Sequence, residues 1–208
     1  MRELLRRAFM VLLLRPFLRF FMGVKVEGAE HLPQSDPFLL VANHNSHLDT
    51  PLLLSLFPVR RLSRIHPVAA ADYWLSSPLK RFVAETFFNV LPIERRGAAR
   101  TGRDPLQALS EAFGRGESLL LFPEGTRGEP EVLSRFHTGA ARLLAEHREV
   151  TVVPVFLKNS GRSLPRGTAL LVPFICEVTV GKPFLPSGDV AEIQERLEGA
   201  VRELAGGP

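Results

Sequence analysis

Short apolar runs separated by amphipathic stretches dominate the hydrophobic pattern of the chain. Several runs are continuous apolar blocks rather than alternating ones, which is typical of strands covered on both faces of a sheet. The predicted strands lie at residues 24–28, 38–43, 66–71, 87–93, 118–122, 151–157 and 175–180. The predicted helices lie at residues 51–57, 76–85, 105–114 and 138–147, and a last one follows Asp189. This alternation predicts an α/β fold whose central sheet is largely parallel or mixed and is flanked by helices.

The first 22 residues depart from this pattern, because they are rich in Leu and Phe and carry several arginines but only one acid, Glu3. The uncharged run Ala8–Leu14 has seven residues, whereas a transmembrane helix needs about 20 mostly apolar residues. A signal peptide is also disfavoured, because Arg15, Pro16 and Arg19 occupy the place of a small-residue cleavage site. We therefore interpret residues 1–22 as an amphipathic, membrane-interfacial helical segment and residues 23–208 as one folded domain.

Two structural expectations follow for this segment. On one continuous helix the pairs Arg2/Arg6 and Arg15/Arg19 would point roughly 140° apart, at about 100° per residue. If all four arginines reach the same lipid phosphates, the helix must break near Pro16. The alternative is a terminal helix that packs on the core, with its arginines solvated.

Length, charge and cysteine content set broad limits. A chain of 208 residues buries enough surface to fold as a single domain without disulfides. Its one cysteine, Cys176, excludes an intramolecular disulfide and indicates a reducing compartment. The net charge of +4 suits an anionic partner such as phosphate or a lipid headgroup. It is too small to indicate a nucleic-acid partner, and we expect none.

Three predicted strands end in polar or charged residues: residues 38–42 lead into NHNSHLD, 87–93 into ERR, and 118–122 into PEGTR. In open α/β sheets, ligands bind outside the carboxyl ends of the strands. If the three strands are parallel neighbours, their polar ends meet in one cleft, which is the predicted functional site.

His44 and Asp49 are the candidate acid–base pair of this site. Five residues apart on one helix they would not meet, so His44 must lie in the loop and Asp49 in the first turn of the next helix. A carboxylate that orients the ring makes histidine an effective base for an alcohol. Asp49 is equally suited to cap that helix, since Ser46 and Asp49 have capping-box spacing. The rival chemistry is a metal site made by His44, His47 and Asp49.

The PEGTR segment is the candidate anion site. Gly125 permits close approach of the backbone, Thr126 supplies a hydroxyl, and Arg127 supplies a planar fork that matches phosphate oxygens. Arg95 and Arg96, at the end of another strand, would add positive charge. The alternative is a surface turn with solvated arginines.

The pattern resembles one known family, the glycerophosphate and lysophospholipid acyltransferases, typified by 1-acylglycerol-3-phosphate acyltransferase. Four motif blocks occur in the family's order. They are Asn43-His44 with Ser46, Leu48 and Asp49; Pro92-Ile93-Glu94-Arg95; Phe122–Arg127; and Val153–Val155. The chain departs from the family where His47 replaces a tryptophan, Pro92 a phenylalanine and His137 a lysine. These changes leave the headgroup of the acceptor open.

The resemblance implies that His44, oriented by Asp49, activates the sn-2 hydroxyl of lysophosphatidate or a related lysophospholipid for attack on an acyl thioester. The donor is acyl-CoA or acyl carrier protein, and no metal or bound cofactor is implied. Arg95 and Arg127 would hold the acceptor phosphate, and Glu124, Gly125 and Thr126 would shape the loop. The implied location is peripheral, on the cytoplasmic face of the membrane. Two alternatives remain: a transacylase or an enzyme for another headgroup, and a non-catalytic protein that binds membrane surfaces.

Overall fold

A computed structural model describes residues 1–94, 104–130, 132–164 and 171–206. Within these residues, seven strands form one sheet in the order β1-β7-β6-β2-β5-β3-β4, and all neighbouring pairs are parallel except the antiparallel pair β6–β7. The strands are β1 (Val24–Glu27), β2 (Phe38–Ala42), β3 (Ile65–Ala70), β4 (Leu91–Ile93), β5 (Ser118–Leu121), β6 (Thr151–Lys158) and β7 (Cys176–Val180). The predicted α/β class with a mixed, mostly parallel sheet is confirmed.

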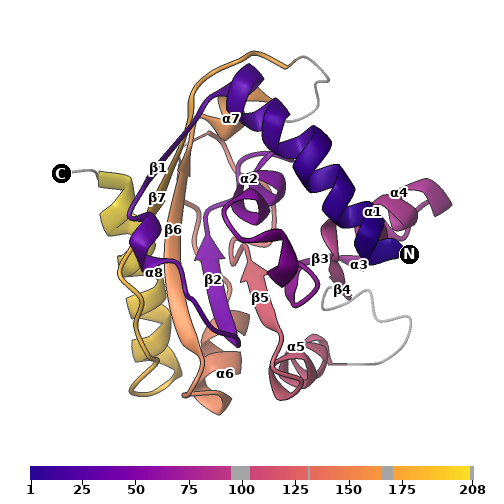
Figure 1. The fold of residues 1–208 in the computed structure, drawn as a ribbon. Helices are drawn as coiled ribbons and strands as arrows, with labels where there is room; N and C mark the ends of the chain where they lie inside the picture. Colours follow the sequence, from indigo (N-terminus) through magenta and orange to yellow (C-terminus); the bar gives the residue numbers. More distant parts are fainter. Residues whose placement is uncertain (95–103, 131, 165–170, 207–208) are drawn as a thin grey trace.

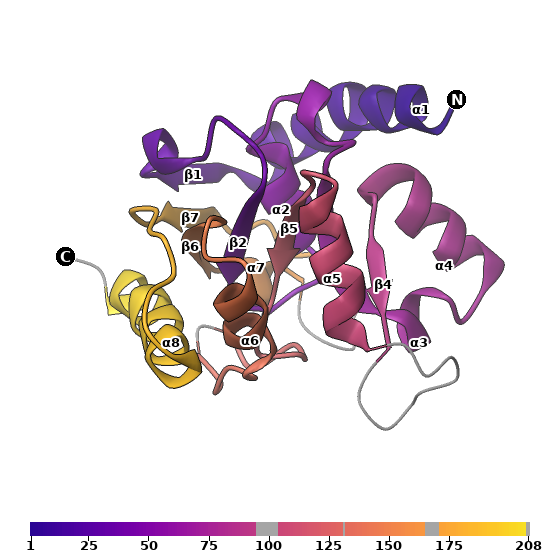
Figure 2. The ribbon, with the colours of Figure 1, turned by 90° about the horizontal axis from the view of Figure 1, so that it is seen from below.

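Helices cover both faces of the sheet (Figures 1 and 2). The longer ones are α1 (Arg2–Phe9), α2 (Asp49–Ser55), α4 (Pro78–Val83), α5 (Pro105–Gly114), α6 (Gly139–Glu146) and α8 (Val190–Gly206). The shorter helical pieces are η1 (Met10–Leu14), η2 (Phe17–Met22), η3 (Ala29–His31), η4 (Val59–Arg61), α3 (Ala71–Trp74), η5 (Ala84–Phe88) and α7 (Ser160–Ser163). The sheet thus forms the middle of three layers.

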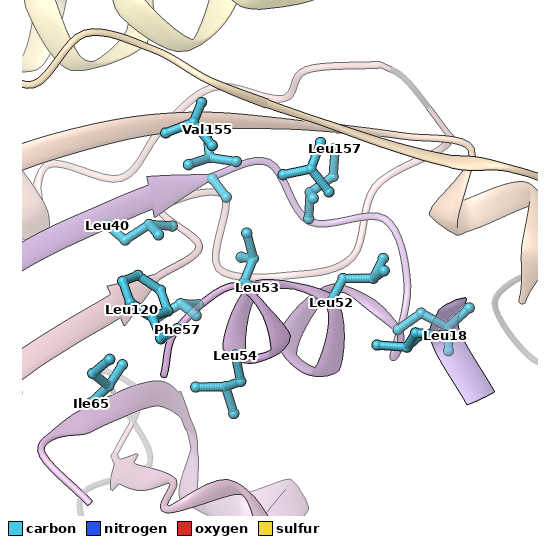
Figure 3. Packing of buried hydrophobic residues seen from close by; sticks show 14 of the residues in the cluster. Leu18, Leu40, Leu52, Leu53, Leu54, Phe57, Ile65, Leu120, Val155 and Leu157 are labelled. Atoms are coloured by element: carbon cyan, nitrogen blue, oxygen red, sulfur yellow. The ribbon is translucent and has the colours of Figure 1, made fainter. Parts of the chain in front are cut away.

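The central strand β2 shows why the sequence has continuous apolar runs. Phe38, Leu40 and Ala42 point into a core shared with α2 and the N-terminal helix. Leu39 and Val41 point the other way, into a core shared with α5, α6 and α8. Figure 3 shows α2 packed between Leu40 and Leu120 of the strands and Leu18 of the N-terminal helix. A strand buried on both faces has no solvent-facing position, so no alternation appears.

The predicted strand at residues 87–93 is wrong in its first half. Phe87 and Phe88 lie in or at the end of the helical turn η5, and the strand β4 begins only at Leu91. The two rings pack on Phe9 of the N-terminal helix, with centroids 4.6 and 5.8 Å from it, instead of on the sheet. Asn89, at φ 55°, turns the chain out of the helix. In addition β3 lies between β4 and β5, so the three polar strand ends share one edge but are not all neighbours.

The expected break near Pro16 is absent. Residues 2–22 form one continuous helix made of α1, η1 and η2, and Pro16 itself has helical dihedral angles. The turns on both sides of Pro16 are π-helical, and the Arg15 N–H donates to the carbonyl of Met10. Proline lacks the N–H of the usual helical hydrogen bond and collides with the preceding turn. The wider π turns accommodate this defect without a kink.

Two arginines of this helix bind carbonyls of the protein. Arg6 is only 6% exposed; its guanidinium donates to the carbonyls of Thr86 (3.1 Å) and Glu85 (2.9 Å) and to the Asn89 side chain (2.9 Å). Arg15 donates to the carbonyl of Phe57. Arg6 therefore satisfies carbonyls that the end of η5 leaves without helical partners. Neither the interfacial interpretation nor the solvated alternative anticipated this role.

The N-terminal helix has two apolar faces. Met10, Leu14, Leu18 and Met22 are buried in the same core cluster as α2. Outward-facing apolar side chains of the helix remain exposed to solvent. Those with the largest exposed fractions are Leu4, Leu12, Leu13, Phe20 and Phe21. In the described part of the chain no helix combines the length and apolar character needed to cross a bilayer. One face thus belongs to the core, and the other offers an apolar surface to the outside.

The buried position of Arg6 gives a test of this arrangement. Arg6→Ala removes donors from one buried and two part-buried acceptors, so the free energy of unfolding should fall by about 1.5–3 kcal/mol. Arg7→Ala, at an exposed position on the same turn, is the matched control and should change it by less than about 0.5 kcal/mol. Urea unfolding of the two variants measures the difference. Equal stabilities would contradict the structural role of Arg6.

Candidate active site

The site begins where β2 ends. The side chain of Asn43 pairs with the backbone of Leu157 on β6: its amide donates to the Leu157 carbonyl (2.9 Å), and its oxygen accepts from the Leu157 N–H (2.7 Å). The side chain thereby replaces one backbone pair of the sheet after the strand has stopped. This anchors the start of the loop that carries His44.

His44 and Asp49 meet as predicted. His44 Nδ1 lies 2.8 Å from Asp49 Oδ2, and the Asp49 side chain is fully buried while that of His44 is 21% exposed. The same oxygen of Asp49 accepts the N–H groups of Asn45 (2.7 Å) and Ser46 (2.8 Å). Because a carboxylate accepts the proton on Nδ1, the free nitrogen of neutral His44 is Nε2. The ring is thus held in the tautomer that leaves Nε2 free to accept a proton.

The structure supports the pairing of Asp49 with His44 but shows no capping of α2 by its carboxylate. Asp49 is the first residue of α2, the N-cap residue Leu48 makes no side-chain capping bond, and the Asp49 carboxylate accepts the Ser46 N–H, which precedes the helix. The Ser46 hydroxyl in turn accepts the Leu48 N–H at 3.2 Å. The same carboxylate binds the His44 ring. Closing the loop before α2 and holding the His44 ring are therefore one structural feature.

The segment after β5 fixes the main chain of His44 from both sides. The Glu124 carboxylate accepts the His44 N–H at 2.9 Å and the Ser134 N–H at 3.2 Å. The Gly128 N–H donates to the His44 carbonyl at 2.9 Å. Glu124 is 4% exposed, so its carboxylate serves these backbone groups and does not line an open surface. This role was not evident from the sequence, where Glu124 stands among exposed loop residues.

Two close contacts shape the same loop. The ring of Phe122 stacks on the His44 imidazole, with centroids 4.2 Å apart and planes 17° apart. Gly125 has φ +72°, and a Cβ at this position would lie 2.8 Å from His137 Cδ2. A larger residue is therefore strained by the backbone conformation, and the His137 ring would have to move to make room for it. Gly125 allows the chain to turn tightly beside His44.

Burial and charge shift the ionisation of two groups. Burial raises the pKa of Glu124, although the hydrogen bonds from His44 and Ser134 act in the opposite direction. Burial lowers the pKa of His47, and the positive charge of Arg127 lowers it further. The positive charge of Arg127 therefore lies close enough to the His44 loop to lower the pKa of one of its side chains.

The other predicted site residues are placed as follows. Thr126 is exposed, and Arg127 is partly buried. Arg95 and Arg96 lie outside the described residues. His47 stacks on Tyr73, with ring centroids 5.7 Å apart. Among the described residues no three His, Cys, Asp or Glu side chains are grouped as a metal site would require, so His44, His47 and Asp49 do not form the alternative cluster.

Residues 23–158 match a protein-family model described as Acyltransferase. The chain belongs to this acyltransferase family. It is 33% identical over 152 residues to the chloroplastic 1-acyl-sn-glycerol-3-phosphate acyltransferase LPAT1 of Arabidopsis thaliana, which covers 71% of the chain. It is 31% identical over 195 residues to the human 1-acyl-sn-glycerol-3-phosphate acyltransferase alpha, covering 86% of the chain.

Another relative carries a different acceptor in its name. The lyso-ornithine lipid O-acyltransferase of Pseudomonas aeruginosa is 38% identical over 141 residues, covering 67% of the chain. The chain spans 39%, 63% and 48% of the lengths of the Arabidopsis, human and Pseudomonas proteins. The crystal structure of the acyltransferase PlsC from Thermotoga maritima has the same fold: the TM-score is 0.74 at 22% identity, covering 99% of this chain and 78% of that one.

The contacts of Glu124 give a prediction. In Glu124→Gln one oxygen is replaced by an amide NH₂, which faces a backbone N–H instead of accepting from it. The His44 loop should shift, so kcat for acyl transfer should fall about 10- to 100-fold, with little change in the KM of the acceptor. Steady-state kinetics separate the two constants. Glu129→Gln, an exposed carboxylate of the same loop, is the control, and a rise confined to KM would instead indicate that Glu124 binds substrate.

Proposed function

We propose that the protein transfers a fatty acyl chain from an acyl thioester, carried by coenzyme A or acyl carrier protein, to the sn-2 hydroxyl of lysophosphatidate or a related lysophospholipid. The observation that carries the proposal is the pairing of His44 Nδ1 with the buried carboxylate of Asp49 at 2.8 Å. This pair provides a general base but no nucleophilic side chain. The family assignment indicates the reaction class, which is acyl transfer. The hydroxyl that is activated therefore belongs to the substrate.

The proposed step is a direct transfer. His44 Nε2 removes the proton from the acceptor hydroxyl as its oxygen attacks the thioester carbonyl, and Asp49 stabilises the imidazolium that forms. The carbon–sulfur bond of the tetrahedral intermediate then breaks. The departing sulfur takes the proton back from Nε2 and leaves as a thiol. The ester and the free thiol are the products, no acyl-enzyme is formed, and His44 is neutral again.

For the acceptor we propose that Arg127 binds the phosphate, assisted by Arg95 and Arg96. Support comes from the effect of the Arg127 charge on His47, a residue of the same loop as His44. A guanidinium matches two phosphate oxygens at once. Gly125 and Thr126 shape the exposed part of the loop after β5, which also carries Arg127.

We further propose a peripheral location on the cytoplasmic face of the membrane, with residues 1–22 as the membrane-association segment of the acyltransferase domain. The exposed apolar face of the N-terminal helix supports contact with lipid. The substrate and product are lipids, so a site at the bilayer surface shortens the path between membrane and base. The lone, buried Cys176 is compatible with a reducing compartment.

A second candidate acceptor is a lysolipid with another headgroup. The lyso-ornithine lipid acyltransferase is among the relatives, and it is 38% identical over the matched region. An exchange of acyl chains between two phospholipids, without a thioester, is the other alternative, because the same base serves it. A mass-spectrometric screen of lysolipid acceptors against both thioester donors distinguishes these reactions by their products.

The base is tested by substitution at both members of the pair. His44→Ala should reduce turnover about 10²- to 10⁴-fold, which is the usual contribution of a positioned general base. Asp49→Asn should also cripple turnover, because an amide favours the wrong tautomer of the ring. Folding is checked by circular dichroism. A folded His44→Ala protein with near wild-type turnover would exclude this mechanism, whatever the acceptor.

The phosphate contact is tested at Arg127. A charge-assisted hydrogen bond contributes about 1.5–3 kcal/mol, so Arg127→Ala should raise the KM of a phosphorylated acceptor about 10- to 100-fold and change kcat less. Arg127→Lys should restore only part of the affinity, because an ammonium lacks the planar fork. An acceptor without a phosphate serves as the control, and an unchanged KM for the phosphorylated one would remove Arg127 from the site.

A further inference from the structure

The segment formed by α3 and α4, residues 71–83, projects apolar side chains for which the described fold provides no cover. Leu79 is 72% exposed, and Leu75 and Phe82 are also exposed. Leu79 and Phe82 are three residues apart on α4 and so lie side by side on its surface. Large apolar groups gathered in this way on a protein surface mark a contact site.

Basic groups accompany these apolar side chains. Lys80 and Arg81 stand between Leu79 and Phe82 in α4. The Lys80 ammonium lies 4.3 Å from the centre of the Tyr73 ring, and Arg81 pairs with Glu85 at 2.7 Å. Apolar side chains that alternate with lysine and arginine match a bilayer surface, where the apolar groups enter the acyl region and the cations remain at the phosphates.

The segment is continuous with the exposed face of the N-terminal helix. The Phe82 ring meets Phe87 edge to face at 5.9 Å, and Phe87 packs on Phe9 at 4.6 Å. Arg2 also pairs with Glu85, the partner of Arg81, at 3.1 Å. Both views of the ribbon place α4 beside the first turns of α1, on the side of the molecule opposite α8 (Figures 1 and 2).

At its other end the segment reaches the active site. Tyr73 of α3 stacks on His47, and His47 lies between His44 and Asp49 in the loop that carries the base. One ring contact therefore joins the loop that carries His44 to α3, and the short α3–α4 segment leads on to the apolar surface beside the N-terminal helix.

We propose that the α3–α4 segment is a second membrane-contact element, which docks on a bilayer containing anionic lipid and holds the mouth of the site at its surface. The inference rests on the proposed function, because a lipid acceptor makes such docking useful. An acidic protein such as a carrier protein would be bound by the cations alone. The apolar side chains, and their continuity with the apolar N-terminal helix, favour lipid.

The chain contains a natural reporter for this contact. Its one tryptophan, Trp74, belongs to α3 and precedes Leu75. The full-length protein is mixed with vesicles of phosphatidylglycerol and phosphatidylcholine whose acyl chains carry bromine, a quencher of tryptophan at short range. Docking of the segment should shift the Trp74 emission to the blue and quench it relative to vesicles without bromine. Unchanged emission from protein that co-sediments with the vesicles would overturn the proposal.

A charge placed on α4 provides the second measurement. Leu79→Glu should weaken vesicle binding on the order of tenfold, since a buried apolar group is lost and a carboxylate faces anionic lipid. Leu185→Glu, which alters an exposed leucine five residues before α8, is the matched control and should bind as the wild type does. Equal binding by the two variants would overturn the proposal. So would an emission shift caused by acyl carrier protein but not by vesicles, which would assign the surface to a protein.

Turnover of a short-chain, freely soluble lysolipid is measured in parallel. Leu79→Glu should leave this turnover unchanged and reduce turnover of a bilayer-embedded acceptor. If the wild type acylates neither acceptor, the proposed function fails. If it acylates the soluble acceptor while Trp74 stays in water on the vesicle, only the docking inference fails.

Discussion

One oxygen of Asp49 organises the active site. It accepts three N–H donors, from the His44 ring and from the backbones of Asn45 and Ser46, in a fully buried position. A buried carboxylate is costly unless donors of this kind surround it. The loop therefore closes around Asp49, and closing it sets the direction of the His44 ring. Loop closure and orientation of the His44 ring depend on the same oxygen atom.

A second carboxylate supports the first from outside the loop. Glu124 accepts the His44 N–H and the Gly128 N–H donates to the His44 carbonyl, so the loops after β2 and β5 are fastened together at His44, the proposed base. Parallel pairing of β2 with β5 makes this possible, because it brings the two loops to the same edge of the sheet. A glutamate of the segment after β5 thus holds the main chain of His44 in place.

The N-terminal helix combines two roles that are usually separate. Its inner face completes the core around α2, and Arg6 satisfies carbonyls at the end of η5. Its outer face is apolar and exposed. If the outer face rests on a membrane, as proposed, a helix packed into the core would hold the whole domain at that surface, whereas a loosely tethered anchor would leave the domain free to tumble. The aromatic contacts between Phe9, Phe87 and Phe82 extend this rigid surface to α4.

The sequence alone determined the elements that depend on local patterns. Six of the seven strands lie within one or two residues of their predicted places; the fold class follows from the alternation of strands and helices. The sequence also suggested the pairing of His44 with Asp49, because a separation of five residues between the end of a strand and the start of a helix allows few arrangements of the two side chains. The exception among the strands is the stretch 87–93, where Phe87 and Phe88 have high strand propensity but pack on Phe9.

Tertiary structure decided the rest, and distance along the chain is the reason. Arg6 meets Thr86 across 80 residues, and His44 meets Glu124 across another 80. Arg6 stands four residues before Met10, on the same buried stripe of the helix, but no local pattern indicates its partners. None distinguishes the buried Glu124 from an exposed loop glutamate either. The insertion of β3 between β4 and β5 is likewise a matter of global topology. Local propensities select helix or strand, whereas the partner of a buried charge is chosen only when distant segments pack together.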